Sequence, residues 1–279
     1  MFLVKYLNFM KWELDKEGIF SCGFDKAVSY PEAGTDNCFN IEDQSPWFNQ
    51  RNELILALVE RHNLNGNFLD IGGGNGFQSR ALLTSQYKGQ VYLIEPSYEG
   101  CLNAKKRGIQ NVYSGVFQDF DFNTNSIGVC GLFDVIEHIK DDILFLNELY
   151  EKLPKNGIVM INVPAFNFLW ADADIHAGHF RRYNKRDVER IERLTKFKII
   201  DNGYYFSFYY LPLFLLRVVP YRLGLRKSLN QTLQSETQNH SKHGVIQKLL
   251  NKRHNYWLKQ LKRGKPAPFG TSMFIILEK

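Results

Sequence analysis

The sequence predicts an α/β fold in which a doubly wound, mostly parallel sheet is covered by helices. From residue 67 onward, short apolar runs typical of buried strands alternate with stretches of helical periodicity. The first run enters a glycine-rich loop, "GGGNG" at 72–76, which opens a helix, and the second run ends on an acid, Glu95. This order of elements predicts right-handed βαβ units whose strand ends face a ligand.

The first half of the chain alternates strand and helix after one leading helix. That helix is expected at 45–62, because Ser45 is a suitable N-cap and Pro46 suits the first turn. The strands of this part are predicted at 67–71, 90–95, 111–117, 126–133 and 157–164. The helices between them are predicted at 77–86, 98–108 and 141–153.

The second half begins with a capped helix and ends with a strand. Asn184 and Asp187 have the spacing of a capping box. Strands are expected at 197–206 and 271–279, and a polar loop followed by a helix fills 228–265 between them. Residues 1–44 are predicted to be an irregular N-terminal extension or cap, which leaves 45–279 as the main domain.

Composition limits the class of protein. The chain has 279 residues and a net charge of +6, which fits an acidic substrate or an anionic lipid surface as well as nucleic acid. No Lys/Arg block resembles a nucleic-acid tail, so DNA is not an expected partner. The four cysteines form no C-x-x-C pair, which predicts neither zinc nor a disulfide framework. With no signal peptide and no transmembrane run evident, we expect a cytoplasmic protein.

The glycine loop discriminates between two cofactor classes. The dinucleotide fingerprint G-x-G-x-x-G fails in both registers, because Phe77 or Ser79 stands where its last glycine should be. The pattern D-x-G-x-G-x-G fits, with Asp70 as its acid. A turn that only packs helix on strand is the simpler alternative.

This pattern resembles motif I of class I S-adenosyl-L-methionine-dependent methyltransferases. "GLFDVIEHIKDD" at 131–142 is similar to the segment after the fourth strand in small-molecule members, and W-F-x-x-R, G-H-x-R-R-Y and P-F-G-x-S motifs resemble those of an unassigned bacterial subgroup. The resemblance implies a Rossmann-like, seven-stranded sheet of order 3-2-1-4-5-7-6 with an antiparallel last strand. It assigns the cofactor site to Asp70, Gly72, Gly73, Gly74, Gly76, Glu95, Pro96, Asp119 and Asp134.

Two histidines are candidate catalytic bases. His138 lies four residues after Asp134, near the carboxyl end of the fourth strand, and imidazole titrates near neutral pH. His179, in the loop after the fifth strand, is the alternative base. His138 has a structural alternative, in which it caps the next helix or shapes the cofactor pocket.

The loop around His179 is also the candidate acceptor site. Asp174, Arg181, Arg182 and Tyr183 fall within ten residues of one another, and arginines suit phosphate or carboxylate. Either they form an anion clamp for the substrate, or an arginine–aspartate network pins the loop. No convincing ligand spacing is present, so no metal is predicted.

The resemblance implies methyl transfer, and we expect an oxygen of a small or lipid- or glycan-linked acceptor. The segment "DVIE" stands where adenine and glutamine methyltransferases carry [N/D]-P-P-[Y/F]. The apolar segment 204–227 is either a lid on the substrate pocket or a peripheral membrane contact. RNA or protein methylation, a non-catalytic cofactor-binding scaffold and nicotinamide chemistry are the alternatives.

Overall fold

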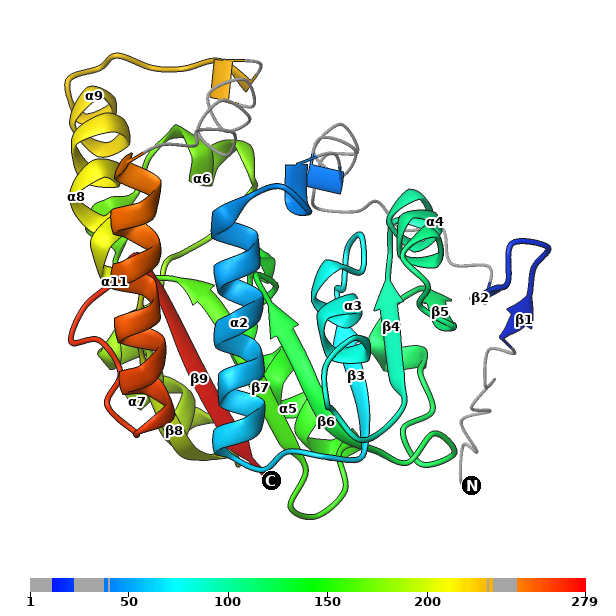
Figure 1. Cartoon of the computed structure of the whole chain (residues 1–279). Coiled ribbons are helices and arrows are strands. Elements are labelled where there is room, and N and C mark those ends of the chain that lie inside the picture. The colour runs from blue at the N-terminus through cyan, green and yellow to red at the C-terminus, as the bar shows by residue number, and fades with distance from the viewer. Residues whose placement is uncertain (1–11, 23–37, 40, 230, 233–244) are drawn as a thin grey trace, which may run out of the picture.

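The described part of the chain forms one nine-stranded sheet with helices on both faces (Figure 1). The computed structural model describes residues 12–22, 38–39, 41–229, 231–232 and 245–279. The strands are β1 (Glu13–Leu14), β2 (Ile19–Ser21), β3 (Asn67–Ile71), β4 (Val91–Glu95), β5 (Asn111–Ser114), β6 (Ile127–Phe133), β7 (Ile158–Pro164), β8 (Lys198–Tyr205) and β9 (Ser272–Glu278).

Seven of these strands follow the expected arrangement. Their order is β5-β4-β3-β6-β7-β9-β8, which corresponds to 3-2-1-4-5-7-6. The strands from β5 to β7 pair in parallel, and β9 runs antiparallel to both β7 and β8. The α/β Rossmann-like fold is therefore confirmed.

The predicted number of seven strands is wrong, because β1 and β2 extend the sheet. β2 pairs in parallel with β5, and β1 pairs with β2 in the antiparallel sense. Ile19 is fully buried, and Phe20 stacks on Tyr113 with ring centroids 4.7 Å apart. These contacts hold a short strand against the otherwise open edge of β5. The remainder of the predicted 1–44 cap lies mostly outside the described residues.

The helices cover the two faces of the sheet. They are α2 (Pro46–Arg61), α3 (Phe77–Leu83), α4 (Tyr98–Lys106), α5 (Asp142–Lys152), α6 (Asp172–His176), α7 (Lys185–Leu194), α8 (Tyr210–Leu213), α9 (Val219–Arg222) and α11 (Val245–Lys262). Apolar residues of α2, α3 and α11 form the core on one face, and those of α5 and α7 form it on the other. Both predicted caps are confirmed, since Ser45 accepts from the Phe48 amide and Asn184 and Asp187 form a capping box.

The helix predicted before the last strand is present, whereas the helical turns that directly follow β8 were not predicted. After β8, a series of short helical turns runs through α8 and α9 to Arg222, and α11 precedes β9. Most of the predicted loop at 228–243 lies outside the described residues. Among the helices that the structure describes, none combines the length and the apolar character needed to cross a membrane.

Candidate active site

The glycine loop turns tightly at the carboxyl end of β3. Gly72, Gly74 and Gly76 adopt left-handed φ angles of +68°, +50° and +75°, which favour glycine. A Cβ on Gly73 would lie 2.6 Å from the Leu93 Cδ1 atom, so the loop packs closely on β4. A Cβ on Gly74 would meet no described atom within 4 Å. The loop is thus fixed on its inner side and open at Gly74.

Two buried carboxyls flank this loop. Glu95 accepts hydrogen bonds from the Gly74 amide at 3.0 Å and from the Ser97 amide at 2.8 Å. Burial raises the pKa of Glu95 to about 7, against the lowering effect of these amides. Asp70 accepts from the Ser79 hydroxyl at 2.7 Å, and burial raises its pKa to about 6. The second Asp70 oxygen has no hydrogen-bond partner among the described residues.

The other predicted cofactor residues lie at the carboxyl ends of neighbouring strands. Pro96 directly follows β4, Asp119 ends a short 3-10 turn after β5, and Asp134 directly follows β6. Because these strands are parallel neighbours of β3, their carboxyl ends meet at one edge of the sheet. All the predicted cofactor residues therefore lie along this edge.

Arg51 is a residue of this edge for which no role was predicted. It lies in α2, is buried, and forms an ion pair with Asp134. Its guanidinium also lies 4.8 Å from the centre of the Trp47 ring. The W-F-x-x-R segment carried a signal, since residues four apart share one helix face. That spacing does not indicate that Asp134 is the ion-pair partner of Arg51.

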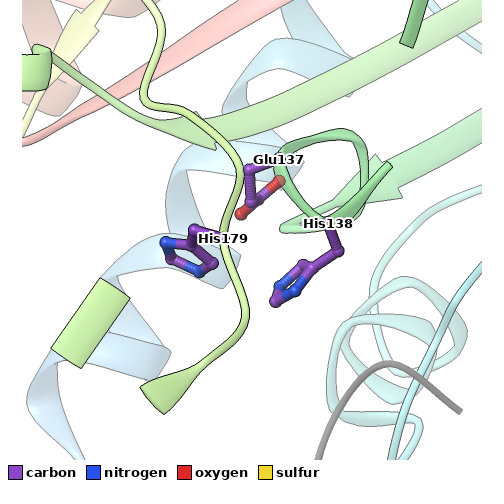
Figure 2. Close-up of side chains that lie close together, drawn as sticks. All are labelled: Glu137, His138 and His179. Carbon is purple, nitrogen blue, oxygen red and sulfur yellow. The ribbon is translucent and has the colours of Figure 1, made fainter. Parts of the chain in front are cut away.

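The two candidate bases meet, together with a third group. Figure 2 shows Glu137, His138 and His179 pointing toward one another from two separate loops. The imidazole rings are edge to face, with centroids 4.7 Å apart. The Phe180 amide donates to the Glu137 carbonyl at 2.8 Å, which ties the two loops together. The Nδ1 atom of His179 lies 2.9 Å from the Asp174 carboxylate.

Burial dominates the electrostatics of this cluster. It raises the pKa of Glu137 to about 8. Burial and the neighbouring His179 lower the pKa of His138 to about 4, against the raising effect of a hydrogen bond with the Ala177 backbone. Neither oxygen of Glu137 has a hydrogen-bond partner in the described part of the chain. Glu137 was not predicted to be a site residue, and the expectation of no metal rested on linear spacing alone.

The charged residues after His179 bond mainly to the protein itself. Arg182 is only 7% exposed and donates to both oxygens of Asp174, at 2.7 and 3.0 Å. The Tyr183 hydroxyl is buried, 2.9 Å from Asp142 Oδ2, and Arg181 lies 3.0 Å from the same oxygen. The geometry favours the network alternative over an anion clamp for these residues.

The apolar segment 204–227 packs against the loop that carries His179. Arg222 donates to the Phe168 carbonyl at 2.9 Å, and Arg226 forms an ion pair with Asp172. His176 lies 2.9 Å from the Lys227 carbonyl oxygen. The segment is therefore linked to the candidate acceptor side of the site.

Comparisons with known proteins agree with this fold. A family model described as "Methyltransferase domain" matches residues 45–201, and no curated protein matches the chain. Phosphoethanolamine N-methyltransferase 2 of Haemonchus contortus, solved with S-adenosyl-L-methionine, is 17% identical with a TM-score of 0.56. The match covers 92% of this chain and 60% of that one, so this chain spans less than two thirds of that relative.

A second solved structure is similar over almost its whole length. The cyclopropane synthase MmaA2 of Mycobacterium tuberculosis is 16% identical with a TM-score of 0.53, and the match covers 90% of this chain and 99% of that one. At these identities the structures show a common fold. The family model, in contrast, covers more than half of the 279 residues. The chain therefore belongs to the S-adenosyl-L-methionine-dependent methyltransferases.

Proposed function

We propose that the protein transfers the methyl group of S-adenosyl-L-methionine to an oxygen atom of a small or lipid- or glycan-linked acceptor. The pairing of His138 with His179 beside the glycine loop carries this proposal. A Cβ on Gly72 would lie 2.9 Å from the Val135 side chain, so the segment that ends in His138 packs directly against the cofactor loop. This contact supports a placement of the two imidazoles near the methyl group of a bound cofactor.

A hydroxyl acceptor needs such a pair because its proton must leave. The acceptor oxygen forms a bond to the methyl carbon while the carbon–sulfur bond breaks, and the electron pair stays on sulfur. The hydroxyl proton passes to a base, and an imidazole that is neutral at pH 7 can accept it. Asp174 holds the Nδ1 side of His179, which leaves the Nε2 atom for this contact.

The apolar segment supports an acceptor with a hydrophobic part. Leu211, Leu215 and Leu216 of the helical turns after β8 are 60%, 52% and 65% exposed. Exposed leucines next to arginines are typical of a surface that contacts lipid, and this segment is linked to the His179 loop. Lipid- or glycan-linked acceptors at a membrane surface therefore fit this site.

Labelled methyl donor tests the proposal directly. Lipid, glycan, small-molecule, RNA and protein fractions of a cell extract are incubated with the purified protein, and label is counted in each. We expect label in a lipid, glycan or small-molecule fraction, with the methyl group on oxygen by mass spectrometry. A His179→Ala variant should lose this label while still binding S-adenosylhomocysteine by calorimetry. Label confined to RNA or protein contradicts the proposal.

A further inference from the structure

The Glu137 carboxyl group is buried without a hydrogen-bond partner among the residues that the structure describes. Its side chain is 0% exposed, and both oxygens lack a hydrogen-bond partner within the described ranges. A buried carboxyl group without partners is costly, and native proteins rarely leave one so. If a histidine alone removes the proton of the acceptor, the reaction does not need Glu137. Its position calls for a ligand between it and the two imidazoles.

The three side chains are arranged as a set of metal ligands. One ligand atom from each of Glu137, His138 and His179 can be chosen so that all lie within 4.8 Å of one another. Two ligands at about 2.1 Å from one ion lie at most about 4.2 Å apart, so a small inward movement of these side chains closes the set. Figure 2 shows that they converge from two loops.

The surroundings orient these ligands in the way metal sites require. Asp174 lies 2.9 Å from Nδ1 of His179, which directs the Nε2 atom toward the cluster. Metal-binding histidines commonly have such a carboxylate on their other nitrogen. Arg182 in turn holds both oxygens of Asp174. The His179 ring is therefore fixed by two successive layers of partners.

We infer that Glu137, His138 and His179 bind one divalent transition-metal cation. Two imidazole nitrogens with one carboxylate oxygen suit Zn²⁺, Mn²⁺ or Fe²⁺ better than Ca²⁺ or Mg²⁺, which prefer oxygen ligands. Three protein ligands leave coordination positions for a substrate oxygen. A coordinated hydroxyl loses its proton more readily, and because both imidazoles are then metal ligands, the proton passes to water instead of to His179. The acceptor class that fits is an alcohol. This last step rests on the proposed function, whereas cation binding does not.

Direct titration tests the site without any turnover. Untagged full-length protein is stripped with EDTA and titrated with MnCl₂ and ZnCl₂ by calorimetry, and its metal content as purified is measured by mass spectrometry. We expect one cation per chain in the wild type. Glu137→Gln keeps the shape of the side chain but not its charge. Loss of a residue that only hydrogen-bonds to a metal ligand weakens metal binding by about 10–100-fold, and Glu137→Gln should weaken it by more. His179→Ala should do the same.

His176, the last residue of α6 and three residues before His179, provides the matched control. Its ring nitrogen faces the Lys227 carbonyl instead of the cluster, so His176→Ala should retain the cation. Binding of S-adenosylhomocysteine by each variant shows that it is folded. A wild type that binds neither cation, or a Glu137→Gln variant that binds as tightly as wild type, overturns the inference. Cation binding without methylation of any hydroxyl leaves the metal site standing and contradicts the proposed function.

Discussion

The pKa of Glu95 makes cofactor binding sensitive to pH. In the proposed cofactor site, the Glu95 carboxylate would accept the ribose hydroxyls of the cofactor. Burial raises the pKa of Glu95 to about 7. Binding that favours the ionised form must release a proton when the free protein holds one. We therefore predict that S-adenosylhomocysteine binds more weakly at pH 5.5 than at pH 7.5.

The size of this effect follows from the fraction ionised. A carboxyl with a pKa of about 7 is roughly 3% ionised at pH 5.5 and about 75% ionised at pH 7.5. The apparent affinity should rise about 25-fold over this range, or about 2 kcal/mol, if only the carboxylate binds the ribose. Glu95→Gln cannot ionise, so its affinity should be lower at pH 7.5 and nearly independent of pH.

Calorimetry at the two pH values measures both quantities. Repeating each titration in two buffers with different ionisation enthalpies gives the number of protons released. The Gln variant is the matched control, because every titratable group other than residue 95 is the same in both proteins. A wild-type dissociation constant that is the same at pH 5.5 and 7.5, with no proton release at pH 6, would refute the reasoning.

The same pKa predicts how the stability of the free protein depends on pH. The pKa of Glu95 in the folded state, about 7, lies above the ordinary value of 4.5 expected when unfolded. Its contribution is therefore fully present below about pH 4.5 and is lost as the pH rises through 7. The loss is on the order of 3 kcal/mol. Urea unfolding of wild type and Glu95→Gln should thus diverge across this range, and parallel curves contradict the assignment.

Three further substitutions test the loop packing and the charge network. Gly73→Ala places a Cβ 2.6 Å from Leu93 Cδ1 and should cost about 1–3 kcal/mol in urea unfolding and weaken S-adenosylhomocysteine binding. Gly128→Ala, whose Cβ would meet no described atom within 4 Å, should change stability by less than about 1 kcal/mol. Tyr183→Phe removes the hydroxyl partner of Asp142 and should lower thermal stability by about 1–3 kcal/mol. An unchanged melting midpoint there means that the network does not pin the loop.

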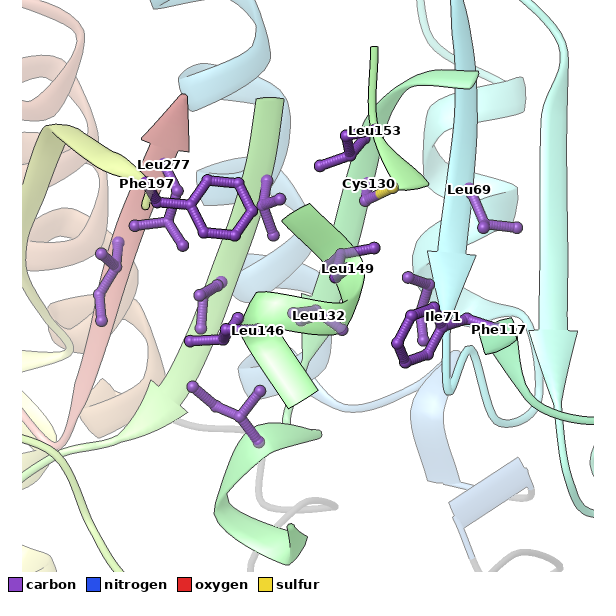
Figure 3. Packing of buried hydrophobic residues seen from close by; sticks show 14 of the residues in the cluster. Leu69, Ile71, Phe117, Cys130, Leu132, Leu146, Leu149, Leu153, Phe197 and Leu277 are labelled. Atoms are coloured by element: carbon purple, nitrogen blue, oxygen red, sulfur yellow. The ribbon is translucent and has the colours of Figure 1, made fainter. Parts of the chain in front are cut away.

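Local patterns predicted most of the fold. Leu146, Leu149 and Leu153 recur at helical spacing in α5 or at its end, and Figure 3 shows them packed on the sheet beside Leu132 of β6. The same short-range signals also predict where the strands end. They therefore predict that Asp70 and the glycine loop lie at the end of a strand. Such signals succeed because the two faces of each element are set by residues only a few positions apart.

Contacts between distant segments were not predictable in the same way. β1 and β2 are too short to show a recognisable strand pattern in the sequence. The position of β2 is fixed by its pairing with the edge of β5. Arg51 and Asp134 meet from two elements that are far apart in the sequence. Glu137 was visible only as part of a motif, because its missing hydrogen bonds are a property of its buried surroundings.

The segment around His179 shows how burial decides between two chemical interpretations of one sequence. Arginines beside a histidine and an aspartate fit an anion site and a structural network equally well by composition. An anion site needs guanidinium groups that reach solvent, whereas Arg182 is 7% exposed and both oxygens of Asp174 already accept its hydrogen bonds. The same carboxylate also holds His179. Arg182 therefore acts on the site by fixing Asp174, and through it the ring that meets Glu137 and His138.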